Sequence, residues 1–429
     1  MMKEAFVQYV WYKQLFTTLS LYTAQHHTLV VLHPGQWSTL AGPDFFNAKV
    51  VIDGLLWVGN VEVHLQSSDW YRHHHEKDSR YDNVILHVVW DYDIPVFNSK
   101  GGEIPTLVVA HYVQKEAIQQ SEKLFAPKST INCQTLLKDT LSPIEWYKWK
   151  EVLYMERLEN KGKQIKQLLD ETTYNWNQVL FCLVAKSFGM NINGDAFFEM
   201  AKALPIPILL KEGTELMNIE ALFFGMAGFL QNEEEILDRY YWNLVDRWNF
   251  YQHKYQLHPK SSTSMHFFKL RPPNFPTIRL AQLAWWFFNQ QYEFTQLLYT
   301  KERSNLLLLL QAEVSPYWET HYTFYKESKP RKKVLSPVFQ ELLLVNTIIP
   351  MQYVWACSKD LEEEVERITA LSVELKAETN GVVSLFEQEG VTVENAFDSQ
   401  ALIQLKKTYC NTNKCLSCAV GRSILNKKN

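Results

Sequence analysis

The chain has 429 residues, of which 46% are hydrophobic and 21% are charged. This length and composition exclude a disordered or fibrous chain and are sufficient for two or three hydrophobic cores. The formal net charge of −4 excludes a uniformly polybasic surface for nucleic acids or membranes, although a local basic groove is compatible with an acidic average.

The first residues, MMKEAFVQYVWYKQLF, predict an amphipathic helix. Lys3, Glu4, Gln8 and Lys13 interrupt the apolar stretch that a secretory signal would need. No run of about 18 apolar residues occurs later in the chain, so we expect no membrane-spanning helix. These features predict a cytoplasmic protein that does not bind membranes.

Residues 1–112 contain nine of the 13 histidines and a series of strand patterns. Alternating apolar residues between turn residues predict strands within HTLVVLH, FFNAKVVIDG, LLWVGNVEVHL, NVILHVVWDYD and IPTLVVAHYV. Asp53 and Gly54 separate the second and third of these segments and favour a type I′ turn, so we expect an antiparallel hairpin there. The N-terminal part should therefore be rich in β-structure behind one leading helix.

The hairpin is expected to gather polar groups. Side chains alternate along a strand, so Asn60, Glu62 and His64 share one face, while Trp57 and its apolar neighbours share the other. Pairing about the predicted turn brings Glu62 and His64 close to Asp44. Closely held carboxylates with room for water and a substrate phosphate are what a hard divalent cation such as Mg²⁺ or Mn²⁺ requires.

Three consecutive histidines follow the third predicted strand. One interpretation places His73 and His75 at the same site, where they bind metal or substrate or donate a proton to a leaving oxygen. The alternative is a solvated polar loop. His87, inside an apolar strand, is expected to be a hydrogen-bonded core residue, with a ligand at the site as the alternative because it shares a sheet with Glu62.

From about residue 142, apolar residues recur every three to four positions and predict helices. Ser142, Pro143 and Glu145 form a capping pattern for the first helix. Further helices are expected over 175–188, 194–203, 218–230, 232–255, 276–298, 302–311, 336–346 and 360–375. A polar, turn-prone stretch, APKSTINCQTLLKDTLSP, predicts a boundary. We therefore expect an α/β domain over 1–130 and a helical domain with a C-terminal cysteine cluster over 131–429.

The helical part contains one candidate phosphate-binding segment, KLRPPNFPTIRLAQLAWWFF. It places Arg271 before a rigid Pro-Pro pair and Arg279 one turn into a helix, and two arginines on a stiff element are suited to bind substrate phosphates. The alternative is that Arg279 pairs with an acidic residue while the aromatic side chains form core.

The last three of the six cysteines, Cys410, Cys415 and Cys418, have C-x4-C-x2-C spacing. This spacing allows three thiolates to face one metal ion or cluster. A fourth ligand would have to come from Cys133, Cys357 or a histidine. We expect zinc or an iron–sulfur cluster that fastens the C-terminus, with reduced structural cysteines as the alternative.

Pro43-Asp44, with Glu62-Val63-His64 beginning eighteen residues after Asp44, resembles the PD-(D/E)XK phosphodiesterase signature. The resemblance implies an α+β protein with a restriction-endonuclease-like core, in which the Asp and Glu bind magnesium and a Lys assists the attacking water. It also implies an acidic residue on the first helix, for which Glu4 is the candidate. Some nucleases resembling this superfamily close a four-iron cluster with three late cysteines and one distant cysteine. His64 stands where the superfamily usually has lysine.

A second resemblance covers nearly the whole chain. The segments AGPDFFNAKV, GNVEVHLQSSDWYRHHH, YDNVILHVVWD, LRPPNFPTIRLAQLA and CLSCAVG are similar to an uncharacterised bacterial family catalogued as a domain of unknown function. This similarity implies membership of that family and adds no biochemistry.

Three functions are consistent with these patterns. The first is a metal-dependent phosphodiesterase acting on nucleic acid, in which Asp44 and Glu62 hold magnesium or manganese, His64 positions the water and Glu4 assists. The second is a non-catalytic interaction protein with a decayed nuclease-like core, for which the change from Lys to His is the main evidence. The third is a cupin-like or other β-barrel enzyme with His73 and His75 pointing inward.

Overall fold

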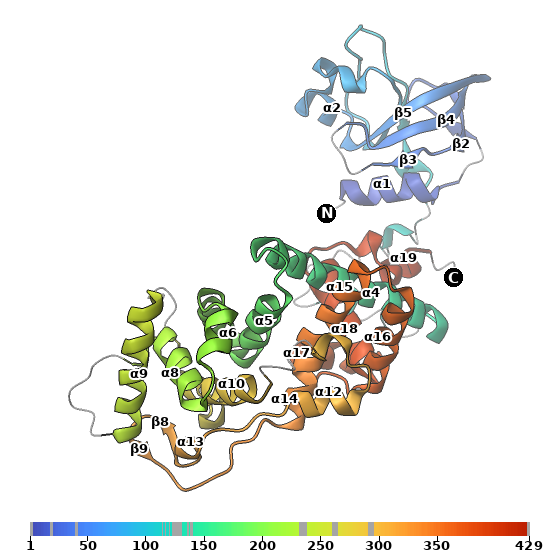
Figure 1. The fold of residues 1–429 in the computed structure, drawn as a ribbon. Helices are drawn as coiled ribbons and strands as arrows, with labels where there is room; N and C mark the ends of the chain where they lie inside the picture. Colours follow the sequence, from blue (N-terminus) through green and yellow to red (C-terminus); the bar gives the residue numbers. More distant parts are fainter. Residues whose placement is uncertain are drawn as a thin grey trace. The chain divides into compact units, whose positions relative to one another are not determined.

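A computed structural model of the chain contains two compact units (Figure 1). The first consists of Met1–Trp149, Leu385–Val391 and Gln404–Asn429, and the second of Lys150–Ser384 and Thr392–Ile403. The structure describes residues 3–17, 20–38, 42–113, 115, 117–119, 121, 131–134, 137, 140–230, 238–259, 265–290 and 296–426. The units differ from the predicted domains 1–130 and 131–429, because the C-terminal cysteines pack beside residues 131–133 of the first unit.

The first unit is built on a mixed sheet, and the helix α1 (Glu4–Lys13) lies beside it (Figure 1). The strand order is β1-β2-β4-β5-β6-β7, with β3 beside β4. Pairs from β1 to β5 are antiparallel, whereas β6 is parallel to both β5 and β7. The strands are β1 (Leu21–Tyr22), β2 (Thr28–His33), β3 (Gln36–Trp37), β4 (Phe45–Ile52), β5 (Leu55–Gln66), β6 (Val84–Asp91) and β7 (Thr106–Val108), which η3 (Val109–His111) follows.

Strands β4 and β5 form the predicted hairpin. Ile52 pairs with Leu55 across Asp53 and Gly54, whose φ angles are 45° and 80°. Left-handed backbone at both central residues is characteristic of the I′ turn, which matches the twist of the two strands. The apolar face predicted for β5 is not buried along the whole strand. Trp57, near the turn, is 44% exposed, and this face is buried only toward the end of the strand.

Because β5 and β6 are parallel, the chain must cross over between them. The crossover contains α2 (Asp69–Arg72), η1 (His75–Lys77) and η2 (Ser79–Tyr81). Trp70 is fully buried there and packs in a cluster completed by Tyr81, Val84, Val96 and Ile104. This cluster fixes the crossover, and the three consecutive histidines with it, against the sheet.

The predicted helices after residue 142 are present. Ser142 and Glu145 form the expected capping box, in which the Ser142 N–H donates to Glu145 Oε2 at 2.8 Å and the Glu145 N–H donates to Ser142 Oγ at 3.4 Å. Parts of two predicted helices, 232–237 and 291–295, lie outside the described residues. The prediction of a mixed sheet followed by a mostly helical region is confirmed. The helical elements are α4 (Pro143–Glu171), α5 (Trp176–Phe188), α6 (Met190–Ala203), α7 (Ile206–Glu212), α8 (Leu216–Met226), α9 (Arg239–Tyr255), η5 (Pro272–Asn274), α10 (Pro276–Gln290), α11 (Gln296–Tyr299), α12 (Arg303–Leu309), α13 (Pro316–Thr320), α14 (Pro337–Leu343), η6 (Leu344–Ile348), α15 (Ile349–Ser358), α16 (Glu362–Glu374), α17 (Gly381–Gln388) and α18 (Ala396–Gln404).

Among its described residues, the second unit has a hairpin formed by β8 (His321–Thr323) and β9 (Lys326–Glu327). The tail contributes η7 (Leu405–Cys410), η8 (Cys415–Ser417) and α19 (Ala419–Asn426) to the first unit. Across the described ranges, no helix has both the length and the apolar character needed to cross a membrane.

A buried carboxyl group makes the stability of the second unit depend on pH. Glu220 on α8 is 1% exposed, and Ser315 Oγ donates to its Oε1 at 2.7 Å. Burial raises the pKa of Glu220 from 4.5 to about 7. The folded protein therefore binds a proton that the unfolded chain releases, so this contribution to stability is complete below pH 4.5 and is lost as the pH rises through about 7.

We expect Glu220→Gln to remove this loss, because glutamine keeps the acceptor oxygen and cannot ionise. A pKa shift of this size corresponds to about 3 kcal/mol. The thermal midpoint of the wild type relative to the variant should therefore fall by several degrees between pH 4.5 and neutral or higher pH. The exposed Glu363→Gln is the control. A difference that does not change with pH would contradict the prediction.

Candidate functional site

The two predicted acidic ligands meet at the end of the hairpin that is remote from its turn. Asp44 immediately precedes β4, and Glu62 lies on β5. The Asp44 N–H donates to Glu62 Oε2 at 3.0 Å, and the Val63 N–H donates to Asp44 Oδ2 at 3.1 Å. These reciprocal bonds hold the carboxyl groups beside each other, as the strand pairing predicted.

Two imidazole rings, those of His64 and His75, lie beside the Glu62 carboxylate, and two more, those of His73 and His87, contact His64. His64 Nδ1 lies 2.8 Å from His87 Nε2 on the neighbouring parallel strand, and His64 Nε2 lies 3.1 Å from His73 Nδ1. Glu62 Oε1 is 3.5 Å from His64 Nε2 and 3.3 Å from His75 Nε2. The sheet and the crossover therefore supply two histidines each to one polar cluster.

Three of these rings have the spacing of metal ligands. His64, His73 and His75 each present a ring nitrogen, and the three atoms all lie within 4.8 Å of one another. His74 adopts a left-handed φ of 60° and is exposed. The crossover thus directs the ring nitrogens of the first and third members of the histidine run into the cluster, where His73 stays exposed, and leaves the middle member outside it.

Burial determines the charge of the two innermost histidines. Burial, followed by the neighbouring His87, lowers the pKa of His64 to about 2, and burial lowers the pKa of His87 to about 3. Both rings are therefore neutral near pH 7, and a single proton lies between His64 Nδ1 and His87 Nε2. When His64 donates that proton, its Nε2 retains a lone pair for a ligand. A neutral His64 does not supply the positive charge of a lysine.

The carboxyl groups have the opposite shift. Burial and then the Glu62 carboxylate raise the pKa of Asp44 to about 7, and burial raises the pKa of Glu62 to about 8. Glu4, the first residue of α1, is close enough for Asp44 to add to the effect of burial in raising its pKa. Like charges held this closely in a buried site favour either a bound proton or a bound cation.

The donor set is compatible with a divalent metal ion. The carboxylate oxygens of Asp44 and Glu62 are ligands that Mg²⁺ and Mn²⁺ accept, whereas the nitrogens of His64, His73 and His75 suit zinc, iron and related ions. The mixture of oxygen and nitrogen donors fits manganese better than magnesium, which prefers oxygen and retains its water.

The residues that hold this cluster in place were not identified from the sequence. Gln8 Nε2, one helical turn after Glu4, donates to Asp44 Oδ1 at 2.9 Å. Trp70 lies against His75 with ring centroids 5.3 Å apart, and Tyr81 stacks on His75 at 3.8 Å. The four-residue spacing of Glu4 and Gln8 was a usable signal, whereas the two aromatic contacts depend on the path of the crossover.

The two predicted phosphate-binding arginines belong to the second unit. Arg271 is exposed before η5. Arg279 is 8% exposed, its guanidinium lies 4.1 Å from the ring centre of Phe339, and it donates to Asn274 Oδ1 at 2.7 Å and Gln282 Oε1 at 3.0 Å. Its buried position does not fit the predicted contact with substrate phosphate. Side-chain amides and a ring hold it, instead of the acidic partner considered as the alternative.

The predicted sulfur ligands also converge. Cys133, Cys410, Cys415 and Cys418 line one pocket of the first unit, and all four are free thiols. Cys357, the other cysteine considered as a fourth ligand, belongs to the second unit.

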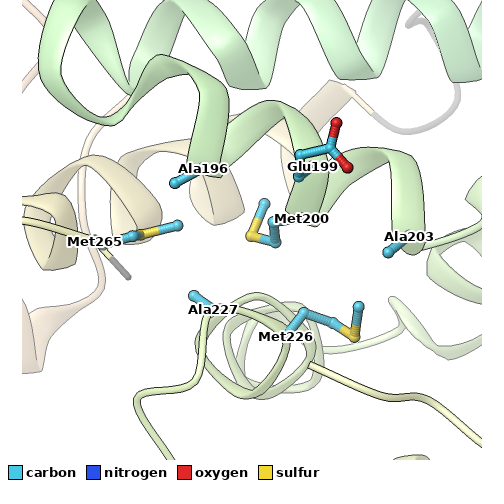
Figure 2. Close-up of a pocket in the computed structure, with 7 residues that line it drawn as sticks. All are labelled: Ala196, Glu199, Met200, Ala203, Met226, Ala227 and Met265. Atoms are coloured by element: carbon cyan, nitrogen blue, oxygen red, sulfur yellow. The ribbon is translucent and has the colours of Figure 1, made fainter. Parts of the chain in front are cut away.

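A further pocket in the second unit has different chemistry (Figure 2). Methionine side chains from α6, α8 and the segment before η5 approach it, together with the Glu199 carboxylate. Its lining contains neither histidine nor cysteine, so the first unit remains the better candidate for catalysis. The lining residues are Ala196, Glu199, Met200, Ala203, Met226, Ala227 and Met265.

A known protein family matches most of the chain. A family model described as "Protein of unknown function (DUF2851)" matches residues 4–381. The matched range contains the carboxylates and histidines of the polar cluster and Cys133, and it ends before Cys410. No curated protein and no solved structure matches the chain.

The turn that sets the hairpin register gives a test of the site's architecture. We expect Gly54→Val to accelerate hydrogen exchange of the amides of β4 and β5, because a β-branched residue at φ 80° costs about 1–2 kcal/mol. Gly54→Asn is the matched control, since asparagine tolerates this conformation. Hydrogen-exchange mass spectrometry of peptides from residues 45–66 measures the difference. Equal amide hydrogen exchange in Gly54→Val and Gly54→Asn would contradict the prediction that the turn stabilises the pairing of β4 and β5.

Proposed function

This chain belongs to that family of proteins of unknown function, and we propose that it is a metal-dependent phosphodiesterase that cleaves nucleic acid. The observation that carries the proposal is the contact between Asp44 and Glu62 within one hairpin, with the imidazoles of His64 and His75 beside the Glu62 carboxylate. The resemblance to the PD-(D/E)XK signature supports it, since that superfamily uses acidic residues at the same two positions. The order of a leading helix and a mixed sheet also resembles that superfamily.

Asp44 and Glu62 would hold the cation, with the nearby imidazoles as further ligands. A bound divalent ion lowers the pKa of an attacking water and offsets charge on the phosphate. The Asp44 oxygens accept hydrogen bonds from Gln8 and Val63, and each oxygen keeps a second lone pair for the ion. We expect manganese to support activity better than magnesium because nitrogen donors lie beside the carboxylates.

His64 would hold the neighbouring side chains of the site in position. It would not replace the positive charge of a lysine. Its Nδ1 is held by His87, so its Nε2 faces His73 and Glu62. Burial and then Asp44 raise the pKa of Glu4, so this carboxylate lies near the acidic pair, where it can accept a proton from water.

Cationic side chains of the crossover are suited to contact substrate phosphates. The Arg72 side chain, next to His73, is 65% exposed and pairs with Asp69, and the Lys77 side chain is 75% exposed and lies 3.8 Å from Glu76 Oε1. A substrate phosphate would have to compete with these two surface ion pairs, which are weak in water. Such phosphate contacts bind the nucleic-acid backbone without reading its sequence.

The alternative function is a non-catalytic protein that retains a nuclease-like core. The neutral, buried His64 at the usual lysine position is the observation that favours it. The barrel alternative is not supported: the described strands pair in the linear order β1 to β7, and His73 and His75 come from the crossover instead of the inside of a barrel.

Cleavage of labelled single- and double-stranded DNA and RNA by the full chain tests the proposal. We expect manganese-dependent cleavage that EDTA abolishes, with a loss of at least about 100-fold in Glu62→Gln and in Asp44→Asn. His74→Asn is the matched control, because His74 belongs to the same histidine run and lies outside the metal-ligand group.

The outcomes separate the two functions. Cleavage that persists in Glu62→Gln would contradict the proposed site. Manganese binding that depends on Glu62, without cleavage of any substrate by the wild type, would favour the non-catalytic alternative. A calorimetric titration with MnCl₂ supplies the binding measurement for the wild type and for both variants.

A further inference from the structure

Four cysteines of the first unit surround one pocket, and we propose that Cys133, Cys410, Cys415 and Cys418 bind an iron–sulfur cluster. Three of them come from the C-terminal tail, and the fourth comes from the distant segment 131–134. Ile131, Asn132, Tyr409 and Gly421 complete the lining of the pocket. The proposal is independent of the phosphodiesterase site.

The four thiols are close enough to influence one another. Burial is the main reason for the raised pKa of Cys133, and Cys410, Cys418 and Cys415 each raise it further. All four are free thiols, and Cys133, Cys415 and Cys418 are buried. Chain folding has therefore collected four soft metal ligands in one place, three from the tail and one, Cys133, from a distant part of the sequence.

The surrounding polar groups are arranged to stabilise thiolates. Cys418 directly precedes α19, and the N–H groups of Val420 and Gly421 donate to its sulfur. Asn132 Nδ2 donates to Cys415 Sγ at 3.6 Å. Hydrogen bonds to ligating sulfur atoms are a principal means by which proteins stabilise metal–thiolate centres.

Gly421 allows the tail to fold tightly enough to form this pocket. A Cβ atom at this position would come within 2.0 Å of the Cys415 carbonyl oxygen. The absence of a side chain lets the first turn of α19 contact the backbone of η8. Cys415 and Cys418 are thereby held on the same side of the tail.

The spread of the sulfur atoms favours a cluster over a single zinc ion. Four sulfurs bound tetrahedrally to zinc at about 2.3 Å would lie about 3.8 Å apart. Over the described part of the chain, the group of three or more ligand atoms within 4.8 Å of one another is His64, His73 and His75, so no three of these sulfurs are that close. A cluster with one cysteine on each iron accommodates wider spacing.

Binding would convert the four thiols to thiolates, with release of four protons. Burial raises the pKa of Cys410 to about 12 and that of Cys418 to about 11, so the unliganded thiols are neutral near pH 7. The cluster would fasten the tail to residues 131–134 within the first unit. This function is structural and requires no change of oxidation state.

The test is the metal and sulfide content of the full chain purified without oxygen. We expect iron and acid-labile sulfide in equal amounts, together with visible absorption from sulfur-to-iron charge transfer. Both should be lost in Cys133→Ser and in Cys418→Ser. Cys182→Ser and Cys357→Ser, which alter cysteines of the second unit, should retain them.

The iron and sulfide content of the wild-type protein tests the proposed cluster even when a variant fails to fold. Circular dichroism would reveal such a failure. Zinc without sulfide would overturn the cluster, and so would four reactive thiols or disulfides in a folded, metal-free protein. Because the measurement is chemical content and not nuclease activity, its failure would leave the phosphodiesterase proposal unchanged.

Discussion

The reciprocal hydrogen bonds between Asp44 and β5 fix the register on which the polar cluster depends. They place Glu62 beside Asp44, and the same register directs His64 toward His87. Successive side chains of a strand point to opposite faces, so a slip of one residue would move Glu62 and His64 away from both the crossover and α1. The chemistry of the first unit therefore depends on a local turn and two backbone contacts.

Burial has opposite effects on the two kinds of side chain in this cluster. It keeps His64 and His87 neutral, and it raises the pKa values of Asp44 and Glu62 into the range where they compete for protons. Such an arrangement is unfavourable for stability by itself, since buried like charges repel. Clusters of this type are characteristic of sites that bind cations or move protons.

The first unit combines two donor sets of different chemical hardness. Oxygen and imidazole donors gather at the hairpin, whereas sulfur donors gather where the tail returns to residues 131–134. Because hard and soft ions prefer different ligands, the two sets would select different metals. The return of the tail also means that the helical unit is an insertion within the first unit's sequence and not a consecutive second domain.

The sequence by itself determined the features that depend on neighbouring residues: the hairpin at Asp53 and Gly54, the shared face of Glu62 and His64, and the capped helix that begins after Ser142. Turn chemistry, strand alternation and capping act over a few residues, so the sequence pattern is sufficient to predict them. Only the tertiary structure decided which histidines of the run reach Glu62, that Arg279 is buried against Phe339, and that Cys133 and not Cys357 joins the tail. Those outcomes depend on packing between distant segments, which leaves no periodic pattern in the sequence.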